Sequence, residues 1–534
     1  MSKLLTSLCV RSAGLFVLIL PLLTSAQPAG TLDPSFGNAG RYVQDFGFQD
    51  NLTHIAVQPA DQKVVTVGTA LTPAFAGQLL VIRLLTDGTP DSTFNGTGVL
   101  TVPDFTESYA YRVIVRDDGK ILVGGASCDP SYNFSFLVMR FLEDGSRDTT
   151  FGQSGIASVD LSPSDDIAYG MAELNDGRIL LAGQMTDPAF NKAPVIIRLE
   201  EDGSLDSTFG TNGVVAMPVT GQDSRFWNIA VQADGRITAC GHYDQGLTGT
   251  GQFNFDVLVA RYWEDGSPDN GFGTNGIVMT PYSAEYVEDG FGLALTPDGC
   301  CYVAGYTTQP DFSFDLLLAK YDSTGALDTG FDTDGIAIWD SAAQDVAYDM
   351  VLQPDGKPLL AGTSGGFFMD DRDFLLVRYR SDGSLDTDFD GDGYSVTTVA
   401  TAFDEANGIC LQADGKILAA GKGNTGPNND VAVMRFNNDL FVGIAEPTAT
   451  ANLSCWPVPV RTGSVVHVWS TLQAERIELT DLYGRTTLLH AGAPTIAQST
   501  IEILLPATLA AGSYQLRMTD KNGKPAQTRL LVVE

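Results

Sequence analysis

One motif of nine residues recurs along most of this chain, with the consensus Leu-Asp-x-x-Phe-Gly-x-x-Gly. Its phenylalanine occurs seven times, at intervals of 58, 57, 58, 63, 59 and 58 residues. The copies are centred on Phe36, Phe94, Phe151, Phe209, Phe272, Phe331 and Phe389. Self-similarity at a nearly constant period indicates a repeat protein, in which each period is one structural unit that packs against its neighbours. The chain is therefore expected to fold as seven similar units.

Each period predicts about four short strands. An Asp-Gly turn, as in DDGK at residues 117–120, separates two apolar runs, which is a strong hairpin signal because glycine adopts positive φ without a clash. A further run such as FLVMRF at residues 136–141 leads through a second turn into the motif, and a fourth strand follows. Many runs are continuously apolar, which is typical of sheets covered on both faces. Propeller blades are covered in this way, so we predict an all-β, seven-bladed β-propeller.

The last unit is divided between the two ends of the repeat region. Its turn at residues 413–416 and its strand at 431–436 are present, but the motif that should follow is missing. The missing motif stands at residues 32–40, ahead of the first complete unit. In a closed ring, a strand near residues 41–45 would complete the last blade and cover an otherwise open strand edge. The sequence thus predicts closure of the ring by an N-terminal strand.

Together these landmarks resemble the delta-60 repeat family. The segments that carry the resemblance are LDxxFGxxG, QPDGKPLLAG at residues 353–362 and DFLLVRY at residues 373–379, with their counterparts in the other units. The resemblance covers about residues 31–441 and implies a β-propeller. Because that family has no well-defined biochemical activity, the resemblance implies a fold and no function.

Residues 1–26 have the features of a secretory signal peptide. Lys3 and Arg11 precede an apolar stretch at residues 13–23, and small residues follow. Cleavage is expected after Ala26. The alternative, a transmembrane anchor, needs a longer apolar run, so no transmembrane segment is expected after removal of the signal.

The repeat ends near residue 445, which assigns residues 27–445 to the propeller and 446–534 to a second domain. A small polar linker at residues 446–454 leads into short alternating strands with Gly and Pro punctuation, which predict a small C-terminal β-sandwich. The segments DLYGRTTLL, LAAGSYQLRM and RLLVV resemble the C-terminal sorting domain of type IX secretion cargo. The resemblance implies the type IX secretion machinery as a partner and a location in the medium or on the outer-membrane cell surface.

The formal net charge of −34 excludes a nucleic-acid phosphate backbone as a partner, since binding one depends on neutralisation by Lys and Arg. It suits a soluble extracellular protein. The cysteines do not recur at one repeat position, so neither a disulfide framework nor a Cys-x-x-Cys metal site is expected. A single cysteine pair between blades stays open as an alternative.

Signals for a metal or for catalysis are incomplete. Asp388, Asp390 and Asp392 match the first half of an acidic calcium loop, but Val399 stands where its closing glutamate would be. No cofactor is therefore expected, with calcium as the alternative. Only four histidines occur in the chain, and two of them lie in the predicted C-terminal domain, so no pair of a nucleophile and a histidine base is indicated. The Asp and Arg positions that recur in every unit favour a structural role, because an active site is usually singular, and the sequence is interpreted as that of a protein that is not an enzyme.

The loops between the second and third strands of each unit vary most in length. They should emerge on one face of the ring, where repeat proteins commonly bind their ligands. Their aromatic residues suit a sugar or protein ligand if they are exposed. The candidate ligand-binding residues are Tyr132, Tyr243, Phe253, Tyr306, Phe312 and Phe367.

The sequence therefore predicts a secreted or cell-surface propeller that binds a glycan or a protein without catalysis. One alternative is an extracellular polysaccharide hydrolase or lyase that uses loop carboxylates, and another is a purely structural envelope protein. Solvent-exposed loop aromatics would favour binding, whereas carboxylates that converge on the central channel would favour an enzyme.

Overall fold

A computed structural model describes residues 27–439, apart from 219–222, 249–250, 252, 283–285, 367–371, 400–402, 425 and 427, together with the strands of the C-terminal region and residues 505–506. The predicted signal peptide and most of the predicted linker lie outside the described residues. Every regular element that the structure describes is a β-strand. Among these residues, no helix is long and apolar enough to cross a membrane.

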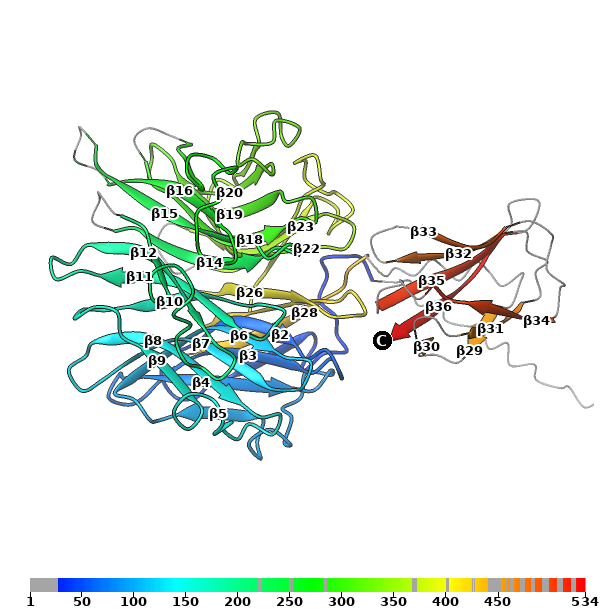
Figure 1. Ribbon diagram of the computed structural model, residues 1–534, viewed down its shortest axis with the longest axis horizontal. Coiled ribbons are helices and arrows are strands. Elements are labelled where there is room, and N and C mark those ends of the chain that lie inside the picture. Colours follow the sequence, from blue (N-terminus) through cyan, green and yellow to red (C-terminus); the bar gives the residue numbers. More distant parts are fainter. Residues whose placement is uncertain are drawn as a thin grey trace, which may run out of the picture.

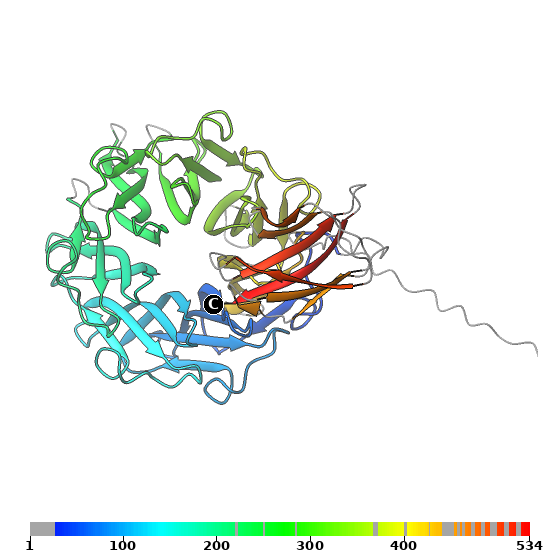
Figure 2. The same ribbon diagram turned by 45° about the vertical axis from the view of Figure 1, so that its right-hand side comes forward.

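Seven four-stranded antiparallel sheets form the propeller, as predicted (Figures 1 and 2). The first strands of the blades contact one another around the ring, so they line its central channel. These first strands are β2 (Asp50–Val57), β6 (Glu107–Val115), β10 (Ile167–Glu173), β14 (Arg225–Val231), β18 (Glu288–Leu295), β22 (Gln344–Leu352) and β26 (Glu405–Leu411). The second strands are β3 (Val64–Leu71), β7 (Ile121–Cys128), β11 (Ile179–Thr186), β15 (Ile237–Leu247), β19 (Cys301–Thr308), β23 (Pro358–Gly365) and β27 (Ile417–Gly423).

The third and fourth strands form the outer part of each blade. The third strands are β4 (Gly77–Leu84), β8 (Phe134–Phe141), β12 (Lys192–Leu199), β16 (Phe253–Tyr262), β20 (Phe314–Tyr321), β24 (Arg372–Arg378) and β28 (Asp430–Phe436). The fourth strands are β5 (Val99–Val102), β9 (Ile156–Val159), β13 (Val214–Ala216), β17 (Ile277–Thr280), β21 (Ile336–Trp339), β25 (Tyr394–Thr397) and, for the last blade, β1 (Arg41–Gln44).

The first and last parts of the repeat region share one sheet, ordered β1-β28-β27-β26. Strand β1 pairs antiparallel with β28, with Tyr42 opposite Val433. An isolated bridge between Leu32 and Phe436 extends this pairing. In Figure 2 the blue N-terminal segment accordingly lies beside the yellow strands of the last blade.

The repeated phenylalanine is the main core residue between blades. All seven copies are fully buried, at 0% exposure. A turn glycine of the next blade packs against the ring: a Cβ on Gly145 would lie 2.9 Å from the Phe94 ring, and one on Gly203 would lie 2.9 Å from the Phe151 ring. Both glycines also have positive φ, which L side chains rarely adopt. The motif phenylalanine and the Asp-Gly turn are therefore two halves of one contact between neighbouring blades.

A buried arginine on the third strand joins this contact in six blades. In the second blade, Arg140 Nε donates to Asp148 at 2.8 Å, its guanidinium lies 4.6 Å from the Phe151 ring, and its Nη1 donates to the Glu201 carbonyl of the third blade at 2.7 Å. Burial opposes the charge of Asp148, but hydrogen bonds from Thr150 and the nearby Arg140 lower its pKa. The structural role predicted for the repeated Asp and Arg positions is confirmed by this arrangement, which we call the Arg–Asp–Phe clamp.

The C-terminal region contains two further sheets. One holds β29 (Leu453–Trp456), β31 (Val465–Ser470) and β34 (Ser499–Leu504). The other holds β30 (Val460–Arg461), β36 (Pro525–Val533), β35 (Gly512–Thr519), β32 (Arg476–Asp481) and β33 (Thr486–Ala491). The packing of these sheets into a sandwich and their role in sorting stay predictions.

Candidate functional site at the mouth of the central channel

Every channel-lining strand carries a β-bulge at the same place. In β2, for example, the ladder with β3 skips one residue between Leu52 and His54. A bulge leaves the extra residue unpaired and turns its side chain away from the ladder. The seven bulged residues are Thr53, Tyr111, Tyr169, Trp227, Phe291, Tyr348 and Asn407. All seven are half-buried, and those of the second to sixth blades are aromatic.

These five aromatic rings form a continuous series along the channel wall, which we call the aromatic arc. Ring centroids are 5.0 Å apart for Tyr111 and Tyr169, 4.5 Å for Tyr169 and Trp227, 5.1 Å for Trp227 and Phe291, and 5.7 Å for Phe291 and Tyr348. All are tilted or edge-to-face pairs, the arrangements that aromatic rings prefer. The arc thus presents a partly exposed aromatic wall that follows five successive blades.

Polar bulge residues occupy the gap between the ends of the arc. Thr53 donates to the Ala110 carbonyl at 2.7 Å, and Asn407 donates to the Leu52 carbonyl at 2.9 Å. These bonds connect the first blade to the second and the last blade to the first. At the bulge positions, the channel wall is therefore aromatic over five blades and polar over the remaining two.

A set of charged residues lies beside Trp227. The Trp227 indole donates to Asp289 at 2.8 Å, and Asp289 also contacts His242 Nδ1 at 2.9 Å. Burial disfavours the charged imidazole, but Asp289 and Asp223 together raise the pKa of His242 to about 9. His242 is therefore an imidazolium at neutral pH. Both of its ring nitrogens are engaged, since Nε2 contacts the Asp223 carbonyl at 2.9 Å, so it positions Asp289 and is not a free base.

Arg225 adds a cation to this part of the wall. It is paired with Asp223, and its guanidinium lies 5.0 Å from the Trp227 ring and 5.8 Å from the Tyr169 ring. A guanidinium over aromatic faces is held in place by cation–π attraction. The arc therefore has a fixed positive group at its centre.

A second carboxylate occupies the equivalent position in the last blade. Glu405 and Asp289 each stand two residues before the bulged residue of their strand. Glu405 is paired with Lys422 at 2.9 Å and Arg372 at 3.7 Å, and the Tyr348 hydroxyl lies 3.5 Å from it. Carboxylates from two blades thus flank the end of the arc formed by Phe291 and Tyr348.

Residues just after the bulges narrow the channel below the arc. Asp349 of the sixth blade lies 3.9 Å from Arg112 of the second, and the Ile409 amide of the seventh blade donates to it at 3.1 Å. His54 of the first blade is 4.0 Å away, beyond hydrogen-bond distance. Burial and the neighbouring Arg112 hold the pKa of His54 well below its usual range, so this histidine is neutral. These side chains form a polar floor that joins four blades.

The candidate residues predicted from the loops differ in their exposure to solvent. Tyr132, Phe253 and Phe312 are exposed, at 62%, 60% and 53%. Tyr306 is half-buried at the channel, with its ring 6.0 Å from Phe291 and 4.8 Å from Phe314. The placement of Tyr243 as a surface ligand residue is wrong: it is 7% exposed, because β15 extends through it and turns its ring into the core between the third and fourth blades. Phe367 lies outside the described residues.

Analysis of the sequence did not identify the residues of the aromatic arc as candidates. Their signal was present as an aromatic at one position of the first strand, as in YAYRV, IAYGM and RFWNI. It could have been found by aligning the first strands, but which residue of a strand bulges depends on pairing with the second strand. Sequence alternation alone assigns such a residue to either face.

The acidic loop of the seventh motif is used as a turn. Asp392 accepts the Tyr394 amide at 3.3 Å, and the Asp390 amide donates to the Ala29 carbonyl at 2.8 Å. Over the described residues, no group of three or more His, Cys, Asp or Glu side chains is assembled as a metal site. The five cysteines that the structure describes are free thiols.

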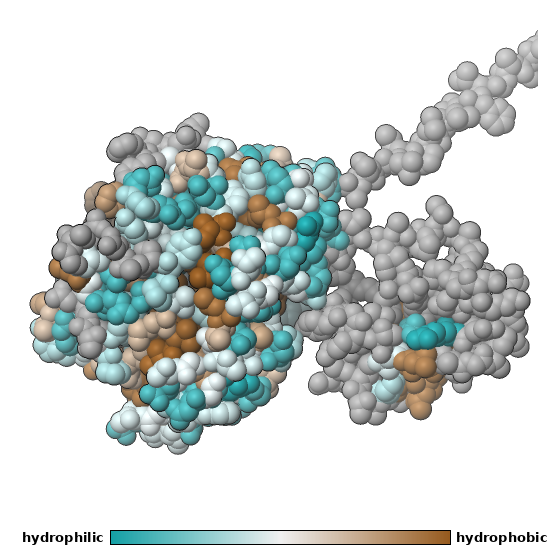
Figure 3. Space-filling model, turned by 90° about the horizontal axis from the view of Figure 1, so that it is seen from above, coloured by the Kyte–Doolittle hydropathy of each residue, from teal (hydrophilic) through white to brown (hydrophobic). Residues whose placement is uncertain are grey.

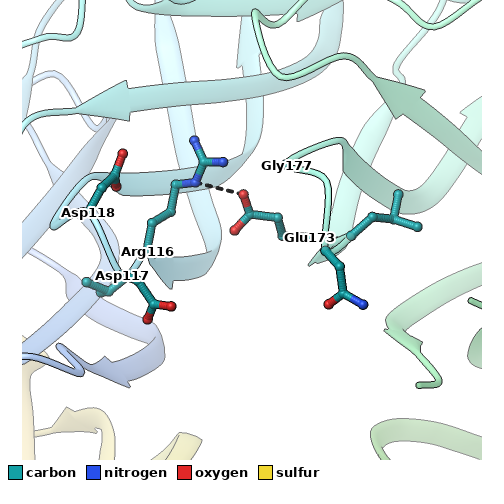
Figure 4. Close-up of a pocket in the computed structure, with 8 residues that line it drawn as sticks. Arg116, Asp117, Asp118, Glu173 and Gly177 are labelled. Atoms are coloured by element: carbon teal, nitrogen blue, oxygen red, sulfur yellow. Dashed lines mark ion pairs between the residues drawn. The ribbon is translucent and has the colours of Figure 1, made fainter. Parts of the chain in front are cut away.

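A separate pocket of about 470 Å³ opens on the opposite face, between hairpin turns of the second and third blades (Figure 4). Arg116 projects into it and is neutralised by Glu173 at 2.7 Å. Its remaining lining consists of the Asp-Gly turn residues that recur in the other blades. No aromatic side chain lines this pocket, and its arginine is already paired, so the aromatic arc is the better candidate.

The ring of four-stranded blades and the channel-lining bulges define the chain as a β-propeller repeat protein. Six segments match a family described as a domain of unknown function (DUF5122) β-propeller, at residues 60–94, 116–151, 174–209, 232–272, 353–389 and 412–441. The prediction of a propeller repeat family is thereby confirmed. No curated protein matches the sequence.

Several solved structures are similar in fold. The propeller domain of the Trilobed protease from Pyrococcus furiosus has 9% identity and a TM-score of 0.39, and the match covers 74% of this chain and 95% of that one. The α-L-arabinofuranosidase Arb93A from Fusarium graminearum has 12% identity and a TM-score of 0.35, covering 62% and 94%. A polysaccharide lyase, an ulvan lyase, has 8% identity and a TM-score of 0.29, covering 92% and 96%.

These comparisons correct one interpretation. The sequence was interpreted as that of a protein that is not an enzyme, and this is overturned because the similar structures include a glycoside hydrolase and a polysaccharide lyase. The physical reason is that recurrence of Asp and Arg across the blades concerns only the scaffold. The channel residues differ from blade to blade, and function on a widely used fold depends on such residues. At these identities the likeness shows the fold and assigns no reaction.

Proposed function

We propose that this protein is an extracellular carbohydrate-active propeller that binds a polysaccharide at the mouth of its central channel. The observation that carries the proposal is the aromatic arc, because sugar rings present apolar C–H faces that stack on aromatic rings. Asp289, Arg225 and Glu405 lie beside these rings and offer hydrogen bonds to sugar hydroxyls. Apolar walls with a few placed polar groups are the usual composition of a small-molecule or oligomer site.

Cleavage of the bound polymer is a second candidate function. It is favoured by the two carboxylates, Asp289 and Glu405, that flank one end of the arc. Glycoside hydrolysis uses a pair of carboxyl groups on either side of the scissile bond. Both carboxylates here are paired with cations, which suits the member of such a pair that acts as base or nucleophile.

Replacing Trp227 by alanine tests the proposal. Trp227 is the centre of the arc and contacts both Asp289 and Arg225. The substitution is expected to weaken polysaccharide binding about 30-fold, which corresponds to a hot-spot loss of about 2 kcal/mol. Calorimetric titration against a panel of soluble polysaccharides measures it, with Trp263→Ala on the opposite face as the control.

Unchanged affinity in Trp227→Ala, with the fold intact, would show that the arc is not the binding site. The same panel is read for new reducing ends and for unsaturated products. Products that disappear in Glu405→Gln or Asp289→Asn would establish cleavage, and binding without products would leave recognition as the function of the arc.

We further infer that the N-terminal strand closes the ring in solution. The ladder between β1 and β28 supports this, as does the buried pair of Arg435 and Asp33 at 2.9 Å. Arg435 also donates to the Thr86 carbonyl of the first blade, so the last clamp links both ends of the repeat region. The inference is tested by the first experiment of the Discussion.

We also propose that residues from about 446 onward direct export and take no part in the ring. The end of the repeat near residue 445 and the resemblance to type IX cargo support this role. A chain that ends at Ala445 is expected to fold but to stay in the periplasm of a host with type IX secretion. Fractionation with an antibody against the propeller measures this, and export of the truncated chain would contradict the proposal.

A further inference from the structure

Four loops of the ring present an aromatic side chain in the same unusual backbone conformation. They connect the second and third strands of the first, second, third and fifth blades, and read TPAF, DPSY, DPAF and QPDF. The aromatic residue at each tip has positive φ, at 62° for Phe75, 61° for Tyr132, 66° for Phe190 and 67° for Phe312. Their exposed fractions are 69%, 62%, 77% and 53%.

The stability of the fold does not explain why aromatic residues occupy these four positions. Positive φ is unfavourable for a bulky side chain, and glycine or asparagine would adopt it at much lower cost. Core packing is no compensation, because each ring is more than half exposed. Backbone strain that is retained at an exposed position is a common property of binding sites. Its recurrence at one position in four blades indicates a common role.

The backbone of each loop is held in a closed turn. A bond from the aromatic amide to the carbonyl three residues earlier closes each turn, as from Phe75 to Thr72 at 2.8 Å and from Tyr132 to Asp129 at 3.0 Å. The second residue of each turn is a proline, whose ring fixes its own φ angle. In two loops an aspartate side chain caps the turn, with Asp129 accepting from Ser131 at 2.7 Å and Asp187 from Ala189 at 2.8 Å. Little loop entropy is therefore lost when a ligand binds.

The four tips lie on the face from which the channel-lining strands begin. Phe75 illustrates this, since its ring lies 6.0 Å from Phe48, just ahead of β2. Figure 3 shows one face of the molecule, on which brown hydrophobic patches lie among teal hydrophilic groups. The four rings belong to separate blades. The surface thus consists of single aromatic contacts repeated around part of the rim, which we call the aromatic crown.

We propose that Phe75, Tyr132, Phe190 and Phe312 form a second carbohydrate-binding site, which adsorbs the protein to an extended, neutral polysaccharide. A polymer with repeating sugar rings matches separate, repeated aromatic contacts, whereas a protein hot spot needs clustered residues shielded from water. The net charge of −34 and the turn aspartates disfavour anionic polymers and anionic membranes. Several weak contacts to one polymer add up through their high effective concentration. The crown shares no residue with the aromatic arc, so it stands whether or not the arc binds sugar.

Asparagine substitution at all four tips gives a test in which binding and stability change in opposite directions. The variant Phe75→Asn, Tyr132→Asn, Phe190→Asn and Phe312→Asn keeps a residue that tolerates positive φ. Its melting temperature is expected to equal or exceed that of the wild type. Its adsorption to insoluble neutral polysaccharides (cellulose, curdlan and xylan, each used as a slurry) is expected to fall at least 10-fold, with a partial loss for each single substitution.

Two variants are the controls. Trp263→Asn removes an exposed aromatic from the opposite face and should adsorb like the wild type. Trp227→Ala should lose binding in the channel but keep adsorption, which separates this proposal from the one above. Adsorption of the four-fold variant at wild-type level would overturn the proposal. So would failure of the wild type to adsorb to any neutral polymer, or binding only to alginate or to vesicles of anionic lipid.

Discussion

Replacing Phe36 by alanine is expected to destabilise the ring as much as replacing Phe94, by about 4 kcal/mol in each case. The two rings occupy equivalent sites, at 0% exposure and beneath a turn glycine of the following blade. Phe36 lies in the N-terminal segment, which joins the last blade only through non-covalent contacts. Phe94 lies between two consecutive strands, β4 and β5, of the first blade. If both substitutions lower the free energy of unfolding in urea equally, the N-terminal segment is packed as firmly as an internal blade.

Two further results bear on ring closure. Deletion of residues 29–45 should remove β1 and expose the edge of β28, which leads to loss of cooperative unfolding or to aggregation. If Phe36→Ala is nearly neutral while Phe94→Ala is not, the last blade is open in solution. A melting curve unchanged by the deletion would contradict closure as well.

Replacing Arg140 by methionine is expected to cost about 3 kcal/mol, since it removes the cation 2.8 Å from the buried Asp148 and leaves Lys120, at 3.3 Å, as the counter-ion. Arg140 and Asp148 are each 4% exposed, and the guanidinium also bonds to the next blade. The pKa of Asp148 lies below its usual range, so its contribution to stability is present at neutral pH and is lost as the pH falls through that lowered pKa. Urea unfolding at pH 7 measures the loss.

The fifth blade supplies a natural control for this experiment. Lys320 replaces the arginine there, and Cys300 stands where the other six blades have the turn lysine or arginine. Lys320 pairs with Asp328 at 2.8 Å, but the side chain of Asp328 is 31% exposed. Lys320→Met should therefore cost less than about 1 kcal/mol, as for a solvated ion pair. Similar losses for Arg140→Met and Lys320→Met would show that burial of the clamp is not what stabilises the blades.

Sequence reasoning reached the scaffold because the scaffold repeats. Phe94, Gly145 and the Arg–Asp pair recur at a constant period, so their shared role could be inferred before any contact was known. Tyr243 shows where such reasoning stops. It stands in a loop by its spacing from the repeat landmarks, but β15 is extended to Leu247 and carries the residue into the core. Local sequence does not determine how far a hairpin continues.

The sequence by itself determined the number of blades, the all-β class and the position of the displaced motif, because each depends on short-range patterns that recur along the chain. Only the tertiary structure decided which residues face the channel. A bulge depends on the register between two strands, and the aromatic arc depends on five strands that are far apart in sequence meeting around one axis. Trp227 and Asp289, 62 residues apart, become partners through ring geometry, which no local pattern encodes.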